Sequence, residues 1–284
     1  IDASSNGDVI AIAAGGHNEH SINPSGKAIT IQCTLNEDGS LATTINATQL
    51  EGVFRLVSGE GEGTLIKDLI ITGGSKYEGG GIYCSNSNTT ITNCIITGNS
   101  ANSGGGGIHC HRCSPTITNC TITGNNGKSY GGGIFCSDHS SPTITDCTFS
   151  FNGGESTYQG GGIFCQSQSS PTITNCTFSD NSAAIGGGIG CSDRSHPTVN
   201  NCIVVGNTGT SQGGGIHCTL MSHPTFSHCT IENNTAYYGG GLYCSENSSP
   251  AVSGGKISGN SASSGYGGGV YVEYGSPTFT NTQV

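Results

Sequence analysis

The sequence predicts an all-β solenoid, in which short strands of successive coils stack into parallel sheets. The first observation is a phrase of glycines, one apolar residue and usually a cysteine, which recurs eight times in the second part of the chain. The copies lie 26 to 29 residues apart, with their apolar residue at Ile82, Ile108, Ile134, Ile163, Ile189, Ile216, Leu242 and Val270.

A second phrase follows the first within each repeat. Residues 114–122 read Ser-Pro-Thr-Ile-Thr-Asn-Cys-Thr-Ile, and nearly the same letters return at 141–149 and 170–178. One repeat is therefore two short β-branched runs bounded by turn residues, which is the length of one solenoid coil. An asparagine closes the units, at Asn99, Asn125, Asn152, Asn181, Asn207, Asn234 and Asn260.

The composition excludes most other fold classes. The 284 residues include 49 Gly and one Met, and no stretch has the apolar spacing of an amphipathic helix. Collagen needs a three-residue period, which is absent, and a disordered chain has no reason to place apolar residues in fixed columns. These observations leave a β architecture.

The charge indicates which partners to expect. The net charge is -10, from 8 basic and 18 acidic residues, and the basic residues form no cluster. We therefore expect no nucleic-acid partner. No apolar run of 18 residues occurs, so we expect no membrane span in this segment. The start at Ile1 indicates a mature or trimmed segment.

We expect one continuous domain with two parts. Residues 1–74 form irregular N-terminal coils, and residues 75–284 form the regular array. About eleven coils stacked at about 4.8 Å predict a rod about 50 Å long. In the first part, strand-like runs lie at 9–12, 28–31, 43–45, 53–56 and 65–71.

Side chains alternate between the two faces of a strand. Each column of equivalent residues in successive repeats is therefore assigned either to the core or to the outer face. Ile82 and Cys84 share the inward face, while Tyr83 points outward. The sequence allows two states for these cysteines. They are either reduced thiols packed in the core or disulfides, such as a bridge from Cys84 to Cys94 within one coil. The two cysteine columns predicted for the core are Cys84, Cys110, Cys136, Cys165, Cys191, Cys218, Cys244 and Cys94, Cys120, Cys147, Cys176, Cys202, Cys229.

These phrases resemble a known family. Gly-Gly-Gly-Ile-Tyr-Cys at 79–84 and Ser-Pro-Thr-Ile-Thr-Asn-Cys at 114–120 look like the right-handed parallel β-helix repeats of bacterial cell-surface proteins, including polymorphic outer-membrane protein repeats. The opening residues 1–10 are similar to first coils of the pectate-lyase-like superfamily. The resemblance implies a right-handed β-helix and an extracellular or cell-surface location. It does not decide function, because the superfamily includes lyases, hydrolases, adhesins and structural rods.

The outward column before each cysteine is the first candidate site. An exposed aromatic stripe suits sugar stacking or a lateral protein interface, although like residues also stack simply to stabilise a sheet. The stripe consists of Tyr83, His109, Phe135, Phe164, His217, Tyr243 and Tyr271.

A threonine array is the second candidate. Its regular hydroxyls and methyls resemble the ice-binding face of solenoid antifreeze proteins, while threonine is also a favourable exposed strand residue. The paired positions are Thr90, Thr92, Thr116, Thr118, Thr143, Thr145, Thr172 and Thr174.

Two other clusters are weaker. Residues 109–113 read His-Cys-His-Arg-Cys and offer zinc donors. However, Cys110 is expected inside and His109 outside, so we predict no metal site and no cofactor. Asp138 and Asp193 lie at equivalent turns two coils apart, within reach of an inverting carboxylate pair, but turn solubility explains them better. We assign no catalytic residue.

The sequence therefore favours a non-enzymatic extracellular rod with a structural, adhesive or filament-forming role. Its expected partners are copies of itself, in end-to-end or lateral assembly, or surface glycans. The alternatives are a carbohydrate-binding or polysaccharide-cleaving β-helix, and ice binding through the Thr-x-Thr face.

Overall fold

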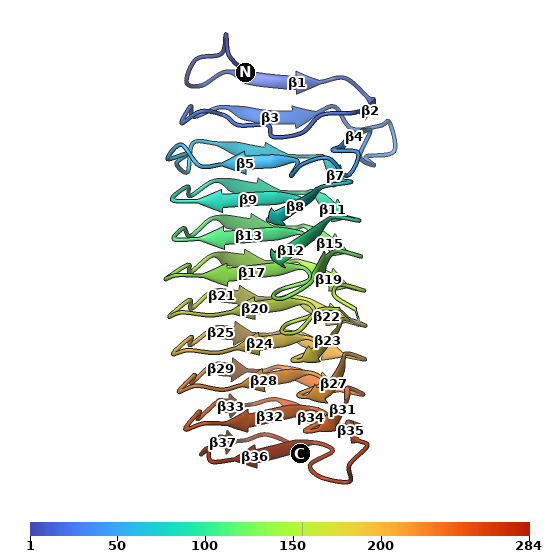
Figure 1. The fold of residues 1–284 in the computed structure, drawn as a ribbon, viewed down its shortest axis with the longest axis vertical. Helices are drawn as coiled ribbons and strands as arrows, with labels where there is room; N and C mark the ends of the chain where they lie inside the picture. The colour runs from blue at the N-terminus through green and yellow to red at the C-terminus, as the bar shows by residue number, and fades with distance from the viewer. Residues whose placement is uncertain (155) are drawn as a thin grey trace.

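A computed structural model describes residues 1–154 and 156–284 of the chain. The described residues form a parallel β-helix, whose coils stack into a straight rod with the two termini at opposite ends (Figure 1). No described residue is helical. Three long sheets run the length of the rod and hold 11, 10 and 9 strands, so the chain makes about ten complete turns, close to the eleven coils that the repeat predicted.

Sheet A contains the first strand of most coils. Its strands are β1 (Val9–Ile12), β3 (Thr30–Cys33), β6 (Leu65–Lys67), β10 (Thr90–Thr92), β14 (Thr116–Thr118), β18 (Thr143–Thr145), β21 (Thr172–Thr174), β25 (Thr198–Asn200), β29 (Thr225–Ser227), β33 (Ala251–Ser253) and β37 (Thr278–Thr280).

Sheet B follows sheet A after a two-residue bend in the regular coils. Its strands are β2 (Gly15–His17), β4 (Thr43–Asn46), β7 (Ile70–Thr72), β11 (Ile95–Thr97), β15 (Thr121–Thr123), β19 (Thr148–Ser150), β22 (Thr177–Ser179), β26 (Ile203–Val205), β30 (Thr230–Glu232) and β34 (Lys256–Ser258).

Sheet C contains the glycine-led phrase. Its strands are β5 (Phe54–Leu56), β9 (Ile82–Ser85), β13 (Ile108–His111), β17 (Ile134–Ser137), β20 (Ile163–Cys165), β24 (Ile189–Cys191), β28 (Ile216–Cys218), β32 (Leu242–Ser245) and β36 (Val270–Glu273).

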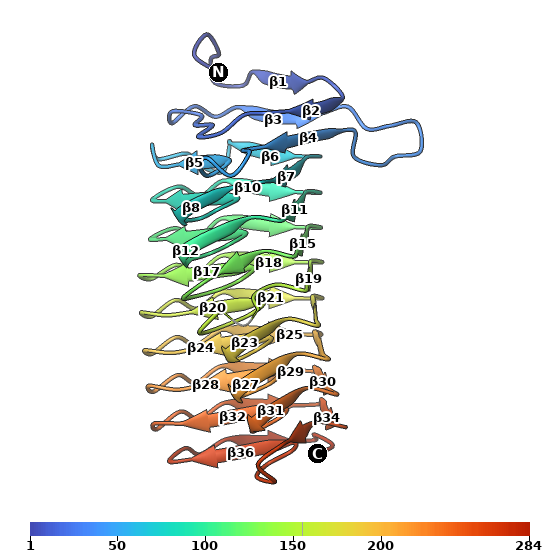
Figure 2. The ribbon, with the colours of Figure 1, turned by 45° about the vertical axis from the view of Figure 1, so that its right-hand side comes forward.

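Short flank strands lie between sheets B and C in the chain and run down one side of the rod (Figure 2). They form two small parallel groups. The flank strands are β8 (Ser75–Glu78), β12 (Ser100–Gly104) and β16 (Asn126–Gly127), then β23 (Ser182–Ile185), β27 (Thr208–Gln212), β31 (Thr235–Tyr238) and β35 (Ser261–Ala262).

Equivalent residues lie directly over one another, as the period predicts. Ile82 pairs with Ile108, and Ile108 pairs with Ile134 in the next coil. Cys84, Cys110 and Cys136 pair in the same register. All members of the two predicted cysteine columns are buried in the core cluster. All fifteen cysteines of the chain carry free thiols. The structure therefore has core thiols, and none of the cysteines, all of which lie in the described residues, forms a disulfide.

Asparagines form a buried ladder at the turn after sheet B. The Nδ2 of Asn125 donates to Oδ1 of Asn152 at 3.0 Å and to the backbone oxygen of Ile96 at 2.8 Å. The backbone N–H of Asn125 also donates to Oδ1 of Asn152, at 3.1 Å. The same contacts recur from Asn99 to Asn260, so the ladder satisfies polar groups that the turn would otherwise bury without partners.

A second buried ladder was not expected from the sequence. The backbone N–H of Ser140 donates to the hydroxyl of Ser169 at 3.1 Å, and Ser169 makes the same bond to Ser195. Cys113 occupies the equivalent place one coil before Ser140 and donates its N–H to that hydroxyl. Cys113, one of the two cysteines outside the predicted columns, therefore belongs to the serine ladder.

Candidate functional site

The aromatic stripe of sheet C points away from the core, as predicted, but most of it is not exposed. Tyr83 pairs with His109 and His109 with Phe135, so the register is correct. The predicted exposure is wrong for five members of the stripe, and only Tyr83 and Tyr271 keep intermediate exposure. The buried members are His109, Phe135, Phe164, His217 and Tyr243.

The flank of the rod covers these rings. Parallel bridges join Gly104 to Tyr130, Tyr130 to Gln159, and Gln159 to Ile185. The ring of Tyr130 stacks on Phe135 and Phe164, with centroids 5.2 and 5.3 Å apart. The flank thus adds a thin second layer outside sheet C, and this layer removes the rings of Phe135 and Phe164 from solvent.

An open pocket of about 410 Å³ lies where this second layer is incomplete. Gly190 interrupts the row of rings between Phe164 and His217. The pocket extends along the rod over five successive coils, which corresponds to about 19 Å at about 4.8 Å per step. It is lined by Tyr158, Gln159, Ile185, Ser192, Gln212, His217, Thr219, Leu220, Tyr243, Ser245, Glu246, Glu273 and Tyr274.

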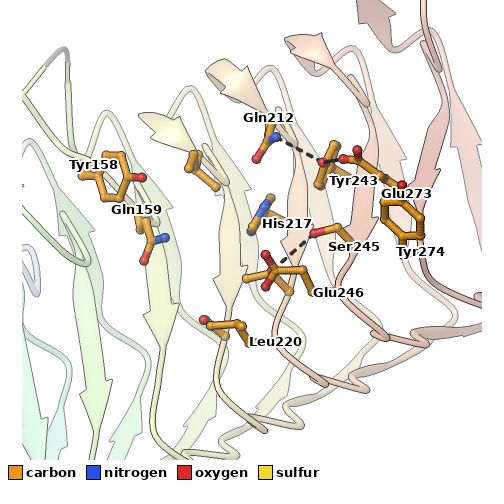
Figure 3. Close-up of a pocket in the computed structure, with 13 residues that line it drawn as sticks. Tyr158, Gln159, Gln212, His217, Leu220, Tyr243, Ser245, Glu246, Glu273 and Tyr274 are labelled. Atoms are coloured by element: carbon orange, nitrogen blue, oxygen red, sulfur yellow. Dashed lines mark hydrogen bonds between the residues drawn. The ribbon is translucent and has the colours of Figure 1, made fainter.

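Two tyrosines lie at opposite ends of the pocket (Figure 3). Tyr158 comes from the segment before β20 and is 55% exposed, and Tyr274 follows β36 and is 82% exposed. An exposed tyrosine presents a flat apolar face together with a polar tip, which is the combination that stacks on a sugar ring. The two rings therefore give the pocket an aromatic contact at each end.

A hydrogen-bond network fixes the polar side chains between these rings. The hydroxyl of Tyr243 donates to Oε2 of Glu273 at 2.6 Å and accepts from Nε2 of Gln212 at 3.1 Å. On the opposite wall, the hydroxyl of Thr219 donates to Oε2 of Glu246 at 2.9 Å. Both carboxylates are thereby held in place with their orientation set by a neighbouring coil.

His217 lies at the floor of the pocket (Figure 3). Its ring is 3% exposed and stacks on Tyr243, with centroids 5.2 Å apart and planes inclined by 9°. Burial lowers its pKa to about 3, so the imidazole is neutral near pH 7. Its Nδ1 has no hydrogen-bond partner among the described residues.

The threonine array has the predicted register on sheet A. Thr90 pairs with Thr116, Thr116 with Thr143, and Thr143 with Thr172. The second column of Thr92, Thr118, Thr145 and Thr174 pairs in the same way, and its members are half-buried. A ligand role for this array stays a prediction.

The cluster at residues 109–113 divides its donors between two sides of the sheet. Cys110 and Cys113 lie in the core, whereas His109 and His111 face outward and both contact the hydroxyl of Ser137. Within residues 1–154 and 156–284, no three His, Cys, Asp or Glu side chains come together to hold a metal ion. Asp138 and Asp193 lie at left-handed turn positions, with φ of 52° and 50°.

The sequence did not reveal the pocket residues. Of those that line it, only His217 and Tyr243 belong to a predicted column. The others come from turns and flank segments that differ from coil to coil. The one available signal was an acidic residue, Glu273, at a strand position where the preceding copy has Ser245.

A model of the right-handed beta helix region matches residues 51–220. The chain belongs to this family. The family confirms the predicted right-handed parallel β-helix, and a Chlamydia polymorphic membrane protein repeat matches residues 228–245, as the resemblance of the phrases implied. The chain matches none of the curated proteins compared with it.

Two solved structures share the fold. Pectate lyase Pel9A has a TM-score of 0.60 at 14% identity, and the match covers 100% of this chain and 71% of that one. ORF18 of Geobacillus virus E2 has a TM-score of 0.53 at 14% identity, covering 96% of this chain and 52% of that one. At such identities the likeness shows the fold alone. None of the described residues belongs to a helix long and apolar enough to cross a lipid bilayer.

Proposed function

We propose that the chain is a non-enzymatic, extracellular or cell-surface rod that binds a carbohydrate chain in the pocket on the outer face of sheet C. The observation that carries the proposal is the pairing of Tyr158 and Tyr274 at the ends of a pocket whose walls hold fixed polar groups. Glycan sites combine aromatic faces with a few well-placed hydrogen-bonding groups. The surface location is supported by the membrane-protein repeat at residues 228–245.

The shape of the pocket supports an extended ligand. Its lining residues come from five consecutive coils, from Tyr158 before β20 to Tyr274 after β36. A ligand that contacts both tyrosines lies along the rod axis and needs several linked sugar rings. The stacked coils hold these contacts at fixed spacing, so binding requires little reorganisation of the protein.

Substitution of both tyrosines tests the proposal. Tyr158→Ser combined with Tyr274→Asn removes the two rings at exposed positions, and we expect binding to an oligosaccharide panel to weaken at least on the order of tenfold while the thermal melt is unchanged. Tyr77→Ser is the matched control, because Tyr77 is also exposed but lies on β8, outside the pocket. Binding that survives the double substitution contradicts the proposed site.

Cleavage of a polysaccharide is the competing function, and one observation favours it. Two carboxylates, of Glu246 and Glu273, line the same pocket, and paired carboxylates are the usual catalysts of glycoside hydrolysis. Release of new reducing ends from bound oligosaccharides distinguishes cleavage from binding alone. Binding without such release favours the adhesive rod.

Two further hypotheses concern the rod as a whole. The direct stacking of Thr116, Thr143 and Thr172 favours an ordered water-binding face. Absence of thermal hysteresis and of altered ice growth would remove ice binding. Self-association, end to end or laterally, is tested by light scattering at high concentration together with electron micrographs. A monodisperse monomer without fibres contradicts it.

A further inference from the structure

The charges that line the pocket are all negative. Glu246 and Glu273 are its only charged lining residues in the part of the chain that the structure describes. Arg194 lies one coil before Leu220, a lining residue, and its backbone N–H donates to the backbone oxygen of Leu220. Its guanidinium pairs with the carboxylate of Asp193 at 3.8 Å. His217 contributes no positive charge because burial keeps it neutral.

Each carboxylate keeps one oxygen available. Glu246 uses Oε2 to accept from Thr219, and Glu273 uses Oε2 to accept from Tyr243. The Oε1 atoms of both have no hydrogen-bond partner among the described residues. A carboxylate whose orientation is already fixed by one bond binds a cationic donor through its second oxygen with little loss of side-chain freedom.

The buried His217 is an independent indication of a ligand. It is a polar side chain almost completely removed from solvent, it lines the pocket, and its Nδ1 has no partner in the described residues. Buried polar groups are nearly always hydrogen-bonded in native proteins. The floor of the pocket thus has unused hydrogen-bonding capacity beside the two carboxylates.

We infer that the pocket binds an oligosaccharide whose sugars carry ammonium groups, such as a deacetylated amino-sugar chain, and that it rejects uronate chains. This inference rests on the proposed carbohydrate-binding function and names its ligand class. Ammonium groups pair with the available oxygens of Glu246 and Glu273, while the sugar rings stack on Tyr158 and Tyr274. A uronate carboxylate would be placed against two like charges, which disfavours binding.

The overall charge of the protein acts in the same direction. The chain carries a net charge of -10, so its field attracts a cationic oligosaccharide and repels an anionic one. Because exposed charges are screened by salt, the preference for the ammonium-bearing ligand should weaken as ionic strength rises. A stacking contact with a neutral sugar does not share this salt dependence.

Calorimetric titration with three hexasaccharides tests the inference: a glucosamine oligomer, its N-acetylated form and a galacturonate oligomer. At about pH 5.5 and low salt, where carboxylates are ionised, we expect the glucosamine oligomer to bind on the order of tenfold more tightly than the N-acetylated one. We expect the galacturonate oligomer not to bind.

Charge-neutralising variants locate the effect. The double variant Glu246→Gln, Glu273→Gln should bind the glucosamine and N-acetylated oligomers with equal affinity. The control Glu37→Gln, Glu62→Gln removes the same charge at exposed sites outside the pocket and should keep the preference. Melting temperatures of all variants establish that the fold is intact.

The outcomes separate the inference from the function on which it rests. Equal binding of the two amino-sugar oligomers by the native protein, or tighter binding of galacturonate, overturns the ligand class and leaves carbohydrate binding in place. A preference that the Glu246 and Glu273 variants retain also overturns it. Failure of all three oligomers to bind contradicts the inference, and a wider glycan panel then decides the proposed function separately.

Discussion

The ring of Tyr130 lies flat over the ring of Phe164, with centroids 5.3 Å apart and planes inclined by 12°. Tyr130 belongs to the flank, and Phe164 lies on the outer face of sheet C. The same tyrosine also stacks on Phe135 in the preceding coil. One residue therefore holds the flank against two coils, and the outer rings become part of a packed layer.

Phe164→Ser should destabilise the rod because the ring is buried. Removing a buried phenylalanine side chain costs about 3 to 5 kcal/mol, and a serine hydroxyl adds an unpaired polar group. Urea unfolding measures the loss. Phe151→Ser is the control, because Phe151 is 66% exposed and should change the free energy of unfolding by no more than about 0.5 kcal/mol. Equal stability of the two variants would show that the stripe is open to solvent.

Asn152→Ala should break the asparagine ladder in its middle. The side chain donates to Ile122 and Asn181 and accepts two bonds from Asn125, so its loss leaves several buried groups without partners. We expect a loss of about 3 kcal/mol in the free energy of unfolding. Asn102→Ala, at an exposed position on β12, serves as the control. A loss no larger than that of the control would show that water replaces the ladder.

The columns that repeat letter for letter could be predicted from the sequence. Ile82, Cys84 and the threonine array recur at nearly constant spacing, and a solenoid allows such residues only one arrangement, directly above one another. Strand alternation then assigned each column to the correct side of its sheet. At these positions, the alternation of side chains along a strand and the period of the repeat predict the same arrangement.

The covered stripe and the pocket could not be predicted in the same way. They depend on segments between the asparagine ladder and the glycine-led phrase, where Tyr130, Gln159 and Ile185 occupy equivalent places with no common chemistry. A sequence repeat reveals only those positions at which the same residue type recurs, and these positions carry a different residue type in each coil. The side chains that cover Phe164, or that leave His217 beside an opening, therefore become evident only in three dimensions.

Gly133→Ala should be poorly tolerated, although the backbone there has no positive φ. A Cβ at Gly133 would lie 2.5 Å from the backbone oxygen of Gly162 in the next coil, which no side-chain movement relieves. We expect a destabilisation of about 3 kcal/mol or more, measured as a lower melting temperature. Gly61→Ala, where a Cβ meets nothing within 4 Å, should leave the melting temperature nearly unchanged. Similar melting of the two variants would contradict the close stacking of coils.

Thiol counting should find every cysteine free and protected. All fifteen are buried, and burial raises the pKa of Cys244 to about 11, which further slows its reaction as a thiolate. A thiol reagent should therefore react very slowly with the native protein and should titrate fifteen thiols in denaturant. A count of thirteen or fewer in denaturant, without added reductant, would reveal disulfides.

Stability should fall as the pH drops below the ordinary range of histidine. Burial lowers the pKa of His217 to about 3, and burial together with His111 lowers that of His109 to about 3. The unfolded chain binds protons at these residues near pH 6.5, whereas the folded chain does so only near pH 3, so protonation favours unfolding throughout that window. Each residue contributes a slope of about 1.4 kcal/mol per pH unit below about pH 6.

His217→Phe isolates one of these two contributions. Phenylalanine keeps a ring to stack on Tyr243 but binds no proton, so the decrease in unfolding free energy from pH 6 to pH 5 should shrink by about 1.4 kcal/mol. This interval lies above the usual titration of carboxyl groups. The control His20→Phe, at an exposed ring, should keep the slope of the native protein. An unchanged slope in His217→Phe would mean that the folded protein accommodates a charged imidazole at the floor of the pocket, and His217 would then add positive charge beside Glu246 and Glu273.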